Sequence, residues 1–400
     1  MKKVAVIGAG AAGCFCAAEL RRLRPEVRVD VYESGPKPLA KVAITGGGRC
    51  NLTNSFEGVR NLAEAYPRGD RLMKRLLRVF SQEDAWRWFE SAGVPLVLQD
   101  DHCVFPRSQD AMDIVHALLR RMDGANLLLR TPVHSIQTPD QVGGDGNLLV
   151  DGEPYDAVVV TTGGAPKGLP MLEGLDLEWV PTVPSLFTFT VRDKGLRSMM
   201  GLVVDAAVSI SGTPFKADGP LLITDWGLSG PAVLKLSSYA ARHLHDVGYQ
   251  APLSVNWLSL NEAEARKRLQ ETATAHPQKQ VSNTPLGGLQ ARLWSHLTQR
   301  AGLRPDIRWA ELGSKGLNRL VATLTQDAYA IAGKTKFREE FVTCGGVALG
   351  NLDPSTLESK RHPGLYFAGE VLDIDAVTGG FNLQAAWTTG AVVARSIVAL

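Results

Sequence analysis

The sequence predicts an α/β fold in which a Rossmann-like domain is interrupted by an inserted β-rich domain that carries a helical subdomain. The run KKVAVIG (2–8) is typical of a buried parallel strand, and GAGAAG and a helical pattern follow it at once. A second strand, VRVDVYE (27–33), completes a βαβ unit. Segments of similar glycine-rich, apolar composition return near the C-terminus. A chain that leaves the first domain and later returns to it explains this pattern.

Two changes in composition set the expected domain boundaries. Alternating strand-like pieces begin near residue 186. From Phe341 the glycine-rich, apolar composition of the N-terminal third reappears. We therefore expect residues 1–186 and 341–400 to form the first domain and residues 187–340 to form the insertion. A stretch rich in Gln, Pro and Arg predicts a helical subdomain at about 260–310.

Local signals predict several helices and one late strand. Ser81 with Asp84, and Asn261 with Glu264, have the spacing of capping boxes at helix starts. Strand character is expected to return near 320–331. The helix over 109–122 is expected to bury one face, made of Met112, Val115, Leu118, Leu119 and Met122.

Composition indicates a soluble globular enzyme. Of 400 residues, 44% are hydrophobic and 21% charged, and the net charge of +2 gives no global field toward polyanions. We therefore expect a small-molecule substrate, no nucleic-acid partner and no membrane partner, and the oligomeric state stays open. Five cysteines, an odd and low number, fit a reducing compartment, so a cytoplasmic location is expected. Neither the cysteines nor the eight histidines have metal-ligand spacing, and no metal is expected.

The first glycine cluster has the pattern of a dinucleotide site. Gly8 permits a tight turn, Gly10 lets a diphosphate approach the backbone, and Gly13 lets the helix pack on the strand. The N-terminus of the following helix favours phosphate charge. Glu33 ends the second strand, 20 residues after Gly13, where a carboxylate can bind a ribose diol and disfavour a 2′-phosphate.

The C-terminal segments favour FAD over NAD as the resident cofactor. GLYFAGE (364–370) is a late strand that ends in an acid, and TGGFNLQAAW (378–387) starts a helix. The acid can bind ribityl hydroxyls, and the helix N-terminus can stabilise negative charge on a reduced flavin. No second G-x-G-x-x-G stands between a strand and a helix. We therefore expect NADH or NADPH to bind transiently, unless a protein supplies the electrons.

Four segments together resemble the BaiN/YhiN-like family of NAD(P)/FAD-dependent oxidoreductases. They are VAVIGAGAAG, KVAITGGGRCNLTN, TCGGVALGNLDPSTLESK (343–360) and GLYFAGEVLDIDAVTGGFNLQAAWTTG (364–390). The resemblance implies FAD in a glutathione-reductase-like Rossmann domain with an inserted β-rich domain and a helical subdomain. The chain departs from the family pattern at Asp225, Trp226, Asn351, Ala376 and Phe381.

If the resemblance holds, the triple glycine at 46–48 wraps the flavin with unobstructed backbone. Arg49 could then balance phosphate charge or hold an anionic substrate, and Asn51 and Thr53 are suitable hydrogen-bond donors. Lys41 either lies near the flavin edge or is solvated. The expected cofactor-binding set is Gly8, Gly10, Ala12, Gly13, Glu33, Lys41, Gly46, Gly47, Gly48, Arg49, Cys50, Asn51, Thr53, Gly163, Gly369, Glu370, Gly380, Phe381, Asn382 and Leu383.

No catalytic residue is identified by sequence, but three side chains are candidates. Cys50 could be a redox-active thiol, yet residues 51–60 contain no second cysteine, which favours packing. Cys344 could approach the flavin or pack in the core. Asp373 could assist proton transfer or serve as a turn residue.

The expected function is FAD-dependent oxidoreduction, with hydride transfer between flavin N5 and an organic small molecule and NAD(P)H as donor. The alternatives are a flavin-dependent RNA-modifying enzyme and a non-catalytic flavin-binding protein. One helical face bears Arg71, Lys74, Arg75 and Arg78. This face could contact RNA, but we favour the interpretation that it is a solvated face of an amphipathic helix.

Overall fold

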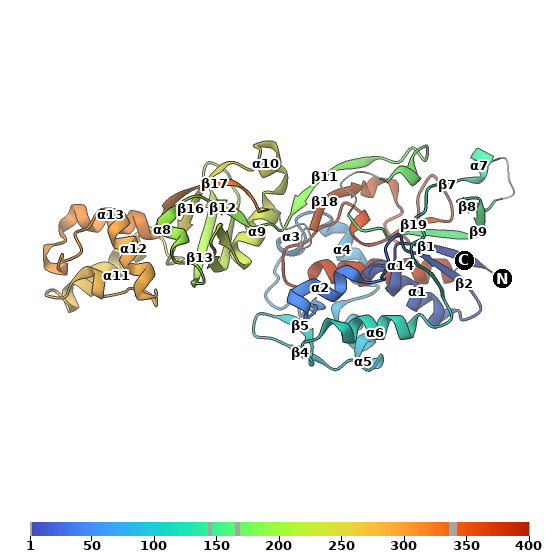
Figure 1. Ribbon diagram of the computed structural model, residues 1–400, viewed down its shortest axis with the longest axis horizontal. Helices are drawn as coiled ribbons and strands as arrows, with labels where there is room; N and C mark the ends of the chain where they lie inside the picture. Colours follow the sequence, from blue (N-terminus) through green and yellow to red (C-terminus); the bar gives the residue numbers. More distant parts are fainter. Residues whose placement is uncertain (1, 143–145, 165–168, 336–341, 400) are drawn as a thin grey trace. The chain divides into compact units, whose positions relative to one another are not determined.

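The computed structural model describes residues 2–142, 146–164, 169–335 and 342–399 (Figure 1). It divides into two compact units, the first formed by residues 1–185 with 339–400 and the second by residues 186–338. The expected return to the first domain at residue 341 lies outside the described residues.

A five-stranded parallel sheet forms the centre of the first unit. Its spatial order is β19-β10-β1-β2-β6. The register sets Val4 beside Ala157 and Val29, and the central strands are buried on both faces, as parallel sheets require. The strands are β1 (Lys3–Ile7), β2 (Arg28–Tyr32), β6 (Asn126–Leu128), β10 (Ala157–Val160) and β19 (Leu365–Phe367).

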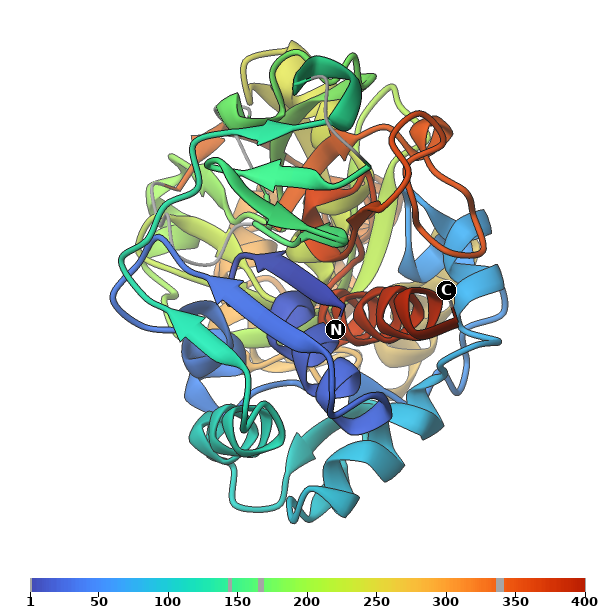
Figure 2. The ribbon, with the colours of Figure 1, turned by 90° about the vertical axis from the view of Figure 1, so that its right-hand side faces the viewer.

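Two helices from opposite ends of the chain pack along each other beside this sheet (Figure 2). They are α1 (Ala11–Leu23) and α14 (Phe381–Ala399). A Cβ at Gly390 would lie 2.8 Å from the Ala12 carbonyl oxygen, so only glycine allows this approach. No helix among the described residues is long and apolar enough to cross a bilayer.

The segment between β2 and β6 supplies short helices and a small antiparallel sheet. The Ser81–Asp84 capping box is confirmed, with Asp84 N donating to Ser81 Oγ at 3.1 Å. The predicted buried helical face is confirmed for Val115 and Leu118 but is wrong for Met112, which is 38% exposed because Ile114 takes the inward position. The elements are α2 (Ala40–Gly48), β3 (Thr53–Asn54), α3 (Leu62–Ala65), α4 (Asp70–Leu76), α5 (Gln82–Ser91), β4 (Leu96–Leu98), β5 (Cys103–Pro106) and α6 (Ala111–Arg121).

Two further small sheets complete the first unit. In one of them β11 pairs antiparallel with β18, and Ser185 stands opposite Val342, so the chain leaves and re-enters this unit through neighbouring strands. The other contains β7, β8 and β9. The elements are β7 (Ile136–Gln137), α7 (Pro139–Val142), β8 (Leu148–Val150), β9 (Glu153–Tyr155), η1 (Pro170–Leu172), β11 (Trp179–Ser185), β18 (Val342–Val347), η4 (Leu349–Asn351) and η5 (Gly369–Val371).

The second unit is built on a closed six-stranded barrel in the order β12-β15-β14-β13-β16-β17. Together with the parallel sheet, it confirms the predicted fold class. Two helices, α9 and α10, meet at Ala240, which caps the first and begins the second. The elements are β12 (Phe189–Val191), α8 (Lys194–Arg197), β13 (Val203–Ile210), β14 (Lys216–Ile223), β15 (Gly227–Ser229), α9 (Pro231–Tyr239), α10 (Ala241–Asp246), β16 (Ala251–Asn256) and β17 (Asp327–Lys334).

Residues 261–325, between β16 and β17, form the helical subdomain. The Asn261–Glu264 capping box is confirmed at its start. The strand expected from residue 320 begins only at Asp327, because Leu320, Val321 and Leu324 recur at helical spacing and are buried. The elements are α11 (Glu262–Ala275), η2 (Val281–Asn283), α12 (Ala291–Arg300), η3 (Trp309–Glu311) and α13 (Gly313–Thr325).

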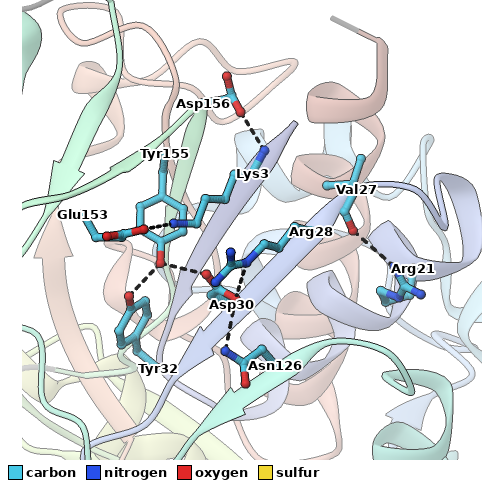
Figure 3. A network of polar contacts seen from close by, with 10 residues as sticks. All are labelled: Lys3, Arg21, Val27, Arg28, Asp30, Tyr32, Asn126, Glu153, Tyr155 and Asp156. Carbon is cyan, nitrogen blue, oxygen red and sulfur yellow. Dashed lines mark hydrogen bonds and ion pairs between the residues drawn. The ribbon is translucent and has the colours of Figure 1, made fainter. Parts of the chain in front are cut away.

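A polar network ties strands β1, β2 and β6 of the parallel sheet to β9 (Figure 3). The Asp30 carboxylate is 1% exposed, and it accepts hydrogen bonds from Tyr155 Oη at 2.9 Å and from Asn126 Nδ2 at 3.3 Å. Because Tyr155 donates to Asp30, Tyr32 must be the donor in the 2.7 Å contact between the two hydroxyls. Lys3 Nζ lies 4.3 Å from the centre of the Tyr155 ring. Buried charge is tolerated here because it is hydrogen-bonded.

This network predicts unequal effects for two matched substitutions. Tyr155→Phe removes a donor from a buried carboxylate, so we expect it to lower the free energy of unfolding by about 1–3 kcal/mol. Tyr32→Phe removes only a neutral hydroxyl pair and should cost about 0.5–1.5 kcal/mol. Urea unfolding monitored by circular dichroism compares the two, and an equal effect would contradict the assigned direction of donation.

Candidate functional site

The first glycine turn has the shape that the sequence predicts. Gly8 has a φ of +107°, and a Cβ there would lie 2.6 Å from the Thr161 carbonyl oxygen. A Cβ at Gly13 would overlap the Gly8 carbonyl oxygen. Gly10 differs, because the space around an added Cβ is open to 4 Å. Gly8 and Gly13 are therefore required by protein packing, and Gly10 leaves room at the start of α1.

Glu33 is held at the mouth of this turn. Its carboxylate accepts hydrogen bonds from Ala9 N at 3.0 Å and from Gly35 N at 2.6 Å. The chain then folds back, and Leu39 N donates to Ala9 O at 2.7 Å. Backbone donors on both sides fix the orientation of this acid.

The triple glycine follows the short helical segment that begins at Ala40. The chain leaves helical geometry at Thr45, whose ψ is 147°. Gly46, Gly47 and Gly48 have φ values of 59°, 68° and 83°. An added Cβ would meet nothing within 4 Å at Gly47 or Gly48. These glycines therefore present exposed backbone in a left-handed conformation.

Arg49 places its charge beside this turn. Its guanidinium lies 4.6 Å from the centre of the Phe105 ring. Its Nε donates to Gly46 O at 3.3 Å, and Nη1 donates to Gln109 Oε1 at 3.4 Å. A cation held by neutral partners keeps its charge available to an anion.

Residues 51–54 are joined directly to the start of α14, more than 300 residues away. Asn54 Nδ2 donates to Gly379 O at 3.0 Å, and Trp387 Nε1 donates to Leu52 O at 2.9 Å. The Asn51 side-chain oxygen accepts from Gly380 N at 3.2 Å when its amide nitrogen faces Thr53 O. The two ends of the polypeptide thus meet at one place.

Three predicted cofactor contacts have their side chains engaged within the protein. The buried Thr53 hydroxyl donates to Gln384 Oε1 at 2.5 Å. Asn382 donates to Ala376 O and accepts from Ala376 N, both at 2.9 Å. Phe381 is buried and packs edge-on against Tyr66 and Phe56. These residues fix the start of α14.

Glu370 connects three segments at the end of β19. Its carboxylate accepts from Thr343 N at 2.8 Å and lies 3.4 Å from Lys41 Nζ. It also lies 3.7 Å from the position of a Cβ added at Gly163. Lys41 is exposed, so this ion pair contributes little to stability. On the other side, a Cβ at Gly369 would lie 2.7 Å from Ala12 Cβ.

The turn before α14 is fixed by a buried ion pair that sequence reasoning missed. The Arg68 guanidinium forms two hydrogen bonds with the buried Asp375 carboxylate. Ser185 Oγ donates to the same carboxylate at 2.9 Å. Asp373 is positioned by its backbone, whose N–H donates to Val347 O at 3.1 Å. Arg68 carries no local sequence signal, because its partner is 307 residues away.

The cysteine candidates are buried free thiols. Burial raises the pKa of Cys50 to about 12 and is the main cause that raises the pKa of Cys103 to about 11. Cys344 is also fully buried, and all five cysteines are free. A reactive thiol needs a lowered pKa and access, so this environment favours packing for Cys50. Among the described residues, no three His, Cys, Asp or Glu side chains gather as metal ligands do.

Known proteins are similar to this chain over nearly its full length. The family profile described as "HI0933-like protein Rossmann domain" matches residues 2–396. A "Ribosomal RNA dihydrouridine synthase" of Escherichia coli is 31% identical, with 98% of this chain and 97% of the relative covered. A Haemophilus influenzae protein of the same description is 29% identical with the same coverage. A "3-dehydro-bile acid delta(4,6)-reductase" of Clostridium scindens is 26% identical, with 99% of each chain covered.

The fold, the glycine turn and these relatives define a flavoprotein oxidoreductase with a Rossmann-type FAD-binding domain. Within that class, the chain belongs to the HI0933-like family. The predicted resemblance to the BaiN/YhiN-like family is therefore confirmed.

The buried thiol predicts a mild phenotype for Cys50→Ala. We expect it to lower stability by about 1 kcal/mol through the lost sulfur packing and to leave the rate of flavin reduction unchanged. Stopped-flow absorbance measures that rate, with Cys16→Ala as the control for loss of a buried thiol. A collapse of the rate in the Cys50 variant alone, with FAD still bound, would instead support a redox-active Cys50.

Proposed function

We propose that this chain is an FAD-dependent reductase that converts uridine in ribosomal RNA to dihydrouridine. The observation that carries the proposal is the full-length match to the Escherichia coli protein of that description, at 31% identity. The Haemophilus influenzae relative supports the same substrate. The proposal replaces the expected small-molecule substrate with the RNA-modifying alternative, and an RNA substrate suits the expected cytoplasmic location.

The residues present fit FAD. Open space at Gly10, Gly47 and Gly48 leaves backbone that a ligand can approach. At Gly8 and Gly13 the surrounding protein atoms already fill the space that a Cβ would need. The turn at Gly10 and the start of α1 would bind the diphosphate, and Glu33 would accept hydrogen bonds from a ribose. Backbone at the triple glycine and at the start of α14 would hold the flavin end, together with Glu370.

Bound FAD supplies hydride chemistry to the site. The protein contributes position and charge. Arg49 offers a cation, held in place by neutral partners, for a phosphate of the substrate or the cofactor. The buried pair of Arg68 and Asp375 fixes the turn that leads into α14. Arg49 and the Arg68–Asp375 pair thus act by preorganisation: they hold charged groups and backbone in fixed positions before the substrate reacts.

Reduction of a double bond also needs a proton, and exposure separates Lys41 from the two thiols. The Cys50 and Cys344 thiols are fully buried. The Lys41 side chain is exposed and lies 3.4 Å from Glu370. This contrast supports Lys41 Nζ, or solvent beside it, as the proton source ahead of either thiol. NADH or NADPH remains the proposed electron donor.

A small organic substrate is the second candidate. The bile-acid reductase relative covers 99% of this chain at 26% identity. Its name and that of the RNA enzymes both denote reduction of a carbon–carbon double bond. The shared chemistry fits one flavin site, so the substrates have to be separated by experiment.

The test is a direct assay of the purified flavoprotein. Transcribed ribosomal RNA is incubated with NADH or NADPH, and the nucleosides are analysed by mass spectrometry. We expect dihydrouridine to form with at least one donor. A protein whose flavin is reduced, but which leaves the RNA unchanged and reduces a steroid enone, would favour the second candidate and contradict the first.

The glycine turn predicts different defects for Gly10→Ala and Gly13→Ala. The Gly10 methyl enters open space, so the protein should fold with near wild-type stability but lose most of its FAD. The Gly13 methyl overlaps the Gly8 carbonyl and should lower stability by about 1–3 kcal/mol. Visible absorbance per protein and thermal unfolding of the apoprotein measure the two effects. Full FAD content in the Gly10 variant would contradict the proposed diphosphate site.

A further inference from the structure

The net charge of +2 conceals a strong asymmetry between the two units. Residues 186–338 contain 19 Lys and Arg against 11 Asp and Glu, a net charge of +8. The rest of the chain contains 24 against 30, a net charge of −6. The second unit therefore attracts a polyanion, and the first repels it.

Within the second unit, positive charge gathers in the helical subdomain. Residues 261–325 contain ten of the basic residues and only five acidic ones. Figure 1 shows α11, α12 and α13 grouped together in this unit, where α13 packs against both other helices. The exposed basic residues are Lys267, Arg268, Lys279, Arg292, Arg300, Arg304, Arg308, Lys315 and Arg319.

Two antiparallel segments of the helical subdomain bring Lys279 and Arg308 close together in the fold. Trp309 N donates to Lys279 O at 3.1 Å, and Val281 N donates to Ile307 O at 2.9 Å. Gln280 stands opposite Arg308 in the same pairing. The Arg308 guanidinium donates to the neutral Gln278 Oε1 at 3.1 Å. The Arg308 guanidinium is thus held by a neutral side chain, which does not offset its positive charge.

Two other arginines of the helical subdomain form ion pairs within the protein, unlike Lys279 and Arg308. Arg300 forms ion pairs with Asp193 and the buried Asp327, and Arg304 pairs with Glu311. Within the described ranges, Lys279, Arg308 and Lys315 form no such pair. They are exposed cations that structure alone does not require.

The basic face of α4 is the competing surface. It belongs to the unit whose net charge is −6. Arg75 there already lowers the pKa of Asp353, which is held down chiefly by its backbone hydrogen bond from Ser355. The long-range field therefore opposes a polyanion near α4 and favours one at the helical subdomain.

We propose that the helical subdomain is the surface that binds the phosphate backbone of the ribosomal RNA substrate, and this rests on the proposed function. Phosphate contacts by Lys and Arg position a nucleic acid without reading its sequence. Electrostatic attraction then brings the RNA to the enzyme, and the affinity of the protein for RNA falls as the salt concentration rises.

The test uses the full-length flavoprotein and deproteinised ribosomal RNA. A triple variant carries Lys279→Glu, Arg308→Glu and Lys315→Glu, and the matched control carries Arg71→Glu and Lys74→Glu on α4 and Arg78→Glu in the turn that follows it. Filter binding across a salt series gives Kd and the slope of log K against log salt. Visible flavin absorbance and thermal unfolding report whether each variant is intact.

We expect the helical variant to bind RNA at least about tenfold more weakly and to reduce the salt slope by about 2 to 3, with its flavin retained. Dihydrouridine formation should then show a raised KM, and the α4 control should resemble wild type. Unchanged binding in the helical variant, or a larger loss in the α4 control, overturns the inference while wild-type activity leaves the proposed function intact. A wild-type protein that neither binds nor modifies RNA overturns both.

Discussion

The site depends on how closely backbone segments approach one another around Ala12. Gly369 and Gly390 both contact this residue at distances that no other side chain allows, and Gly13 packs on the Gly8 carbonyl in the same way. Together they fasten β19 and α14 to the first βαβ unit. Since nothing larger than hydrogen fits, the spacing of these segments is set by backbone sterics. The acid at the end of β19 and the start of α14 inherit their positions from this contact.

Local patterns predicted the parts of the fold that local physics decides. The first βαβ unit, the glycine turn and both capping boxes depend on residues within about 30 positions of each other. The fate of Thr53 could not be predicted, because its hydroxyl is taken by Gln384, 331 residues further along the chain. The side chain of Asn382, a predicted cofactor contact, hydrogen-bonds to the backbone of Ala376. Whether a polar side chain faces a ligand or the core is decided by such distant partners.

The net charge of the whole chain is a poor guide to a nucleic-acid partner for a related reason. A sum over the chain has no spatial information, and opposite excesses of charge in the two units cancel almost completely. The expectation of no nucleic-acid partner rested on that sum. Only the division of the chain into units shows where a polyanion is attracted, and charge arguments become useful once they are applied to one unit at a time.

The return of the chain through β18, β19 and α14 has a consequence for synthesis. The barrel ends at Lys334 and the helical subdomain at Thr325, so both can fold while residues 342–399 are still on the ribosome. The parallel sheet lacks its edge strand β19, and α1 lacks its covering helix, until residues 365–399 emerge. The N-terminal half of the protein is therefore the last to mature, and a nascent chain stalled before α14 exposes apolar surface to chaperones and proteases.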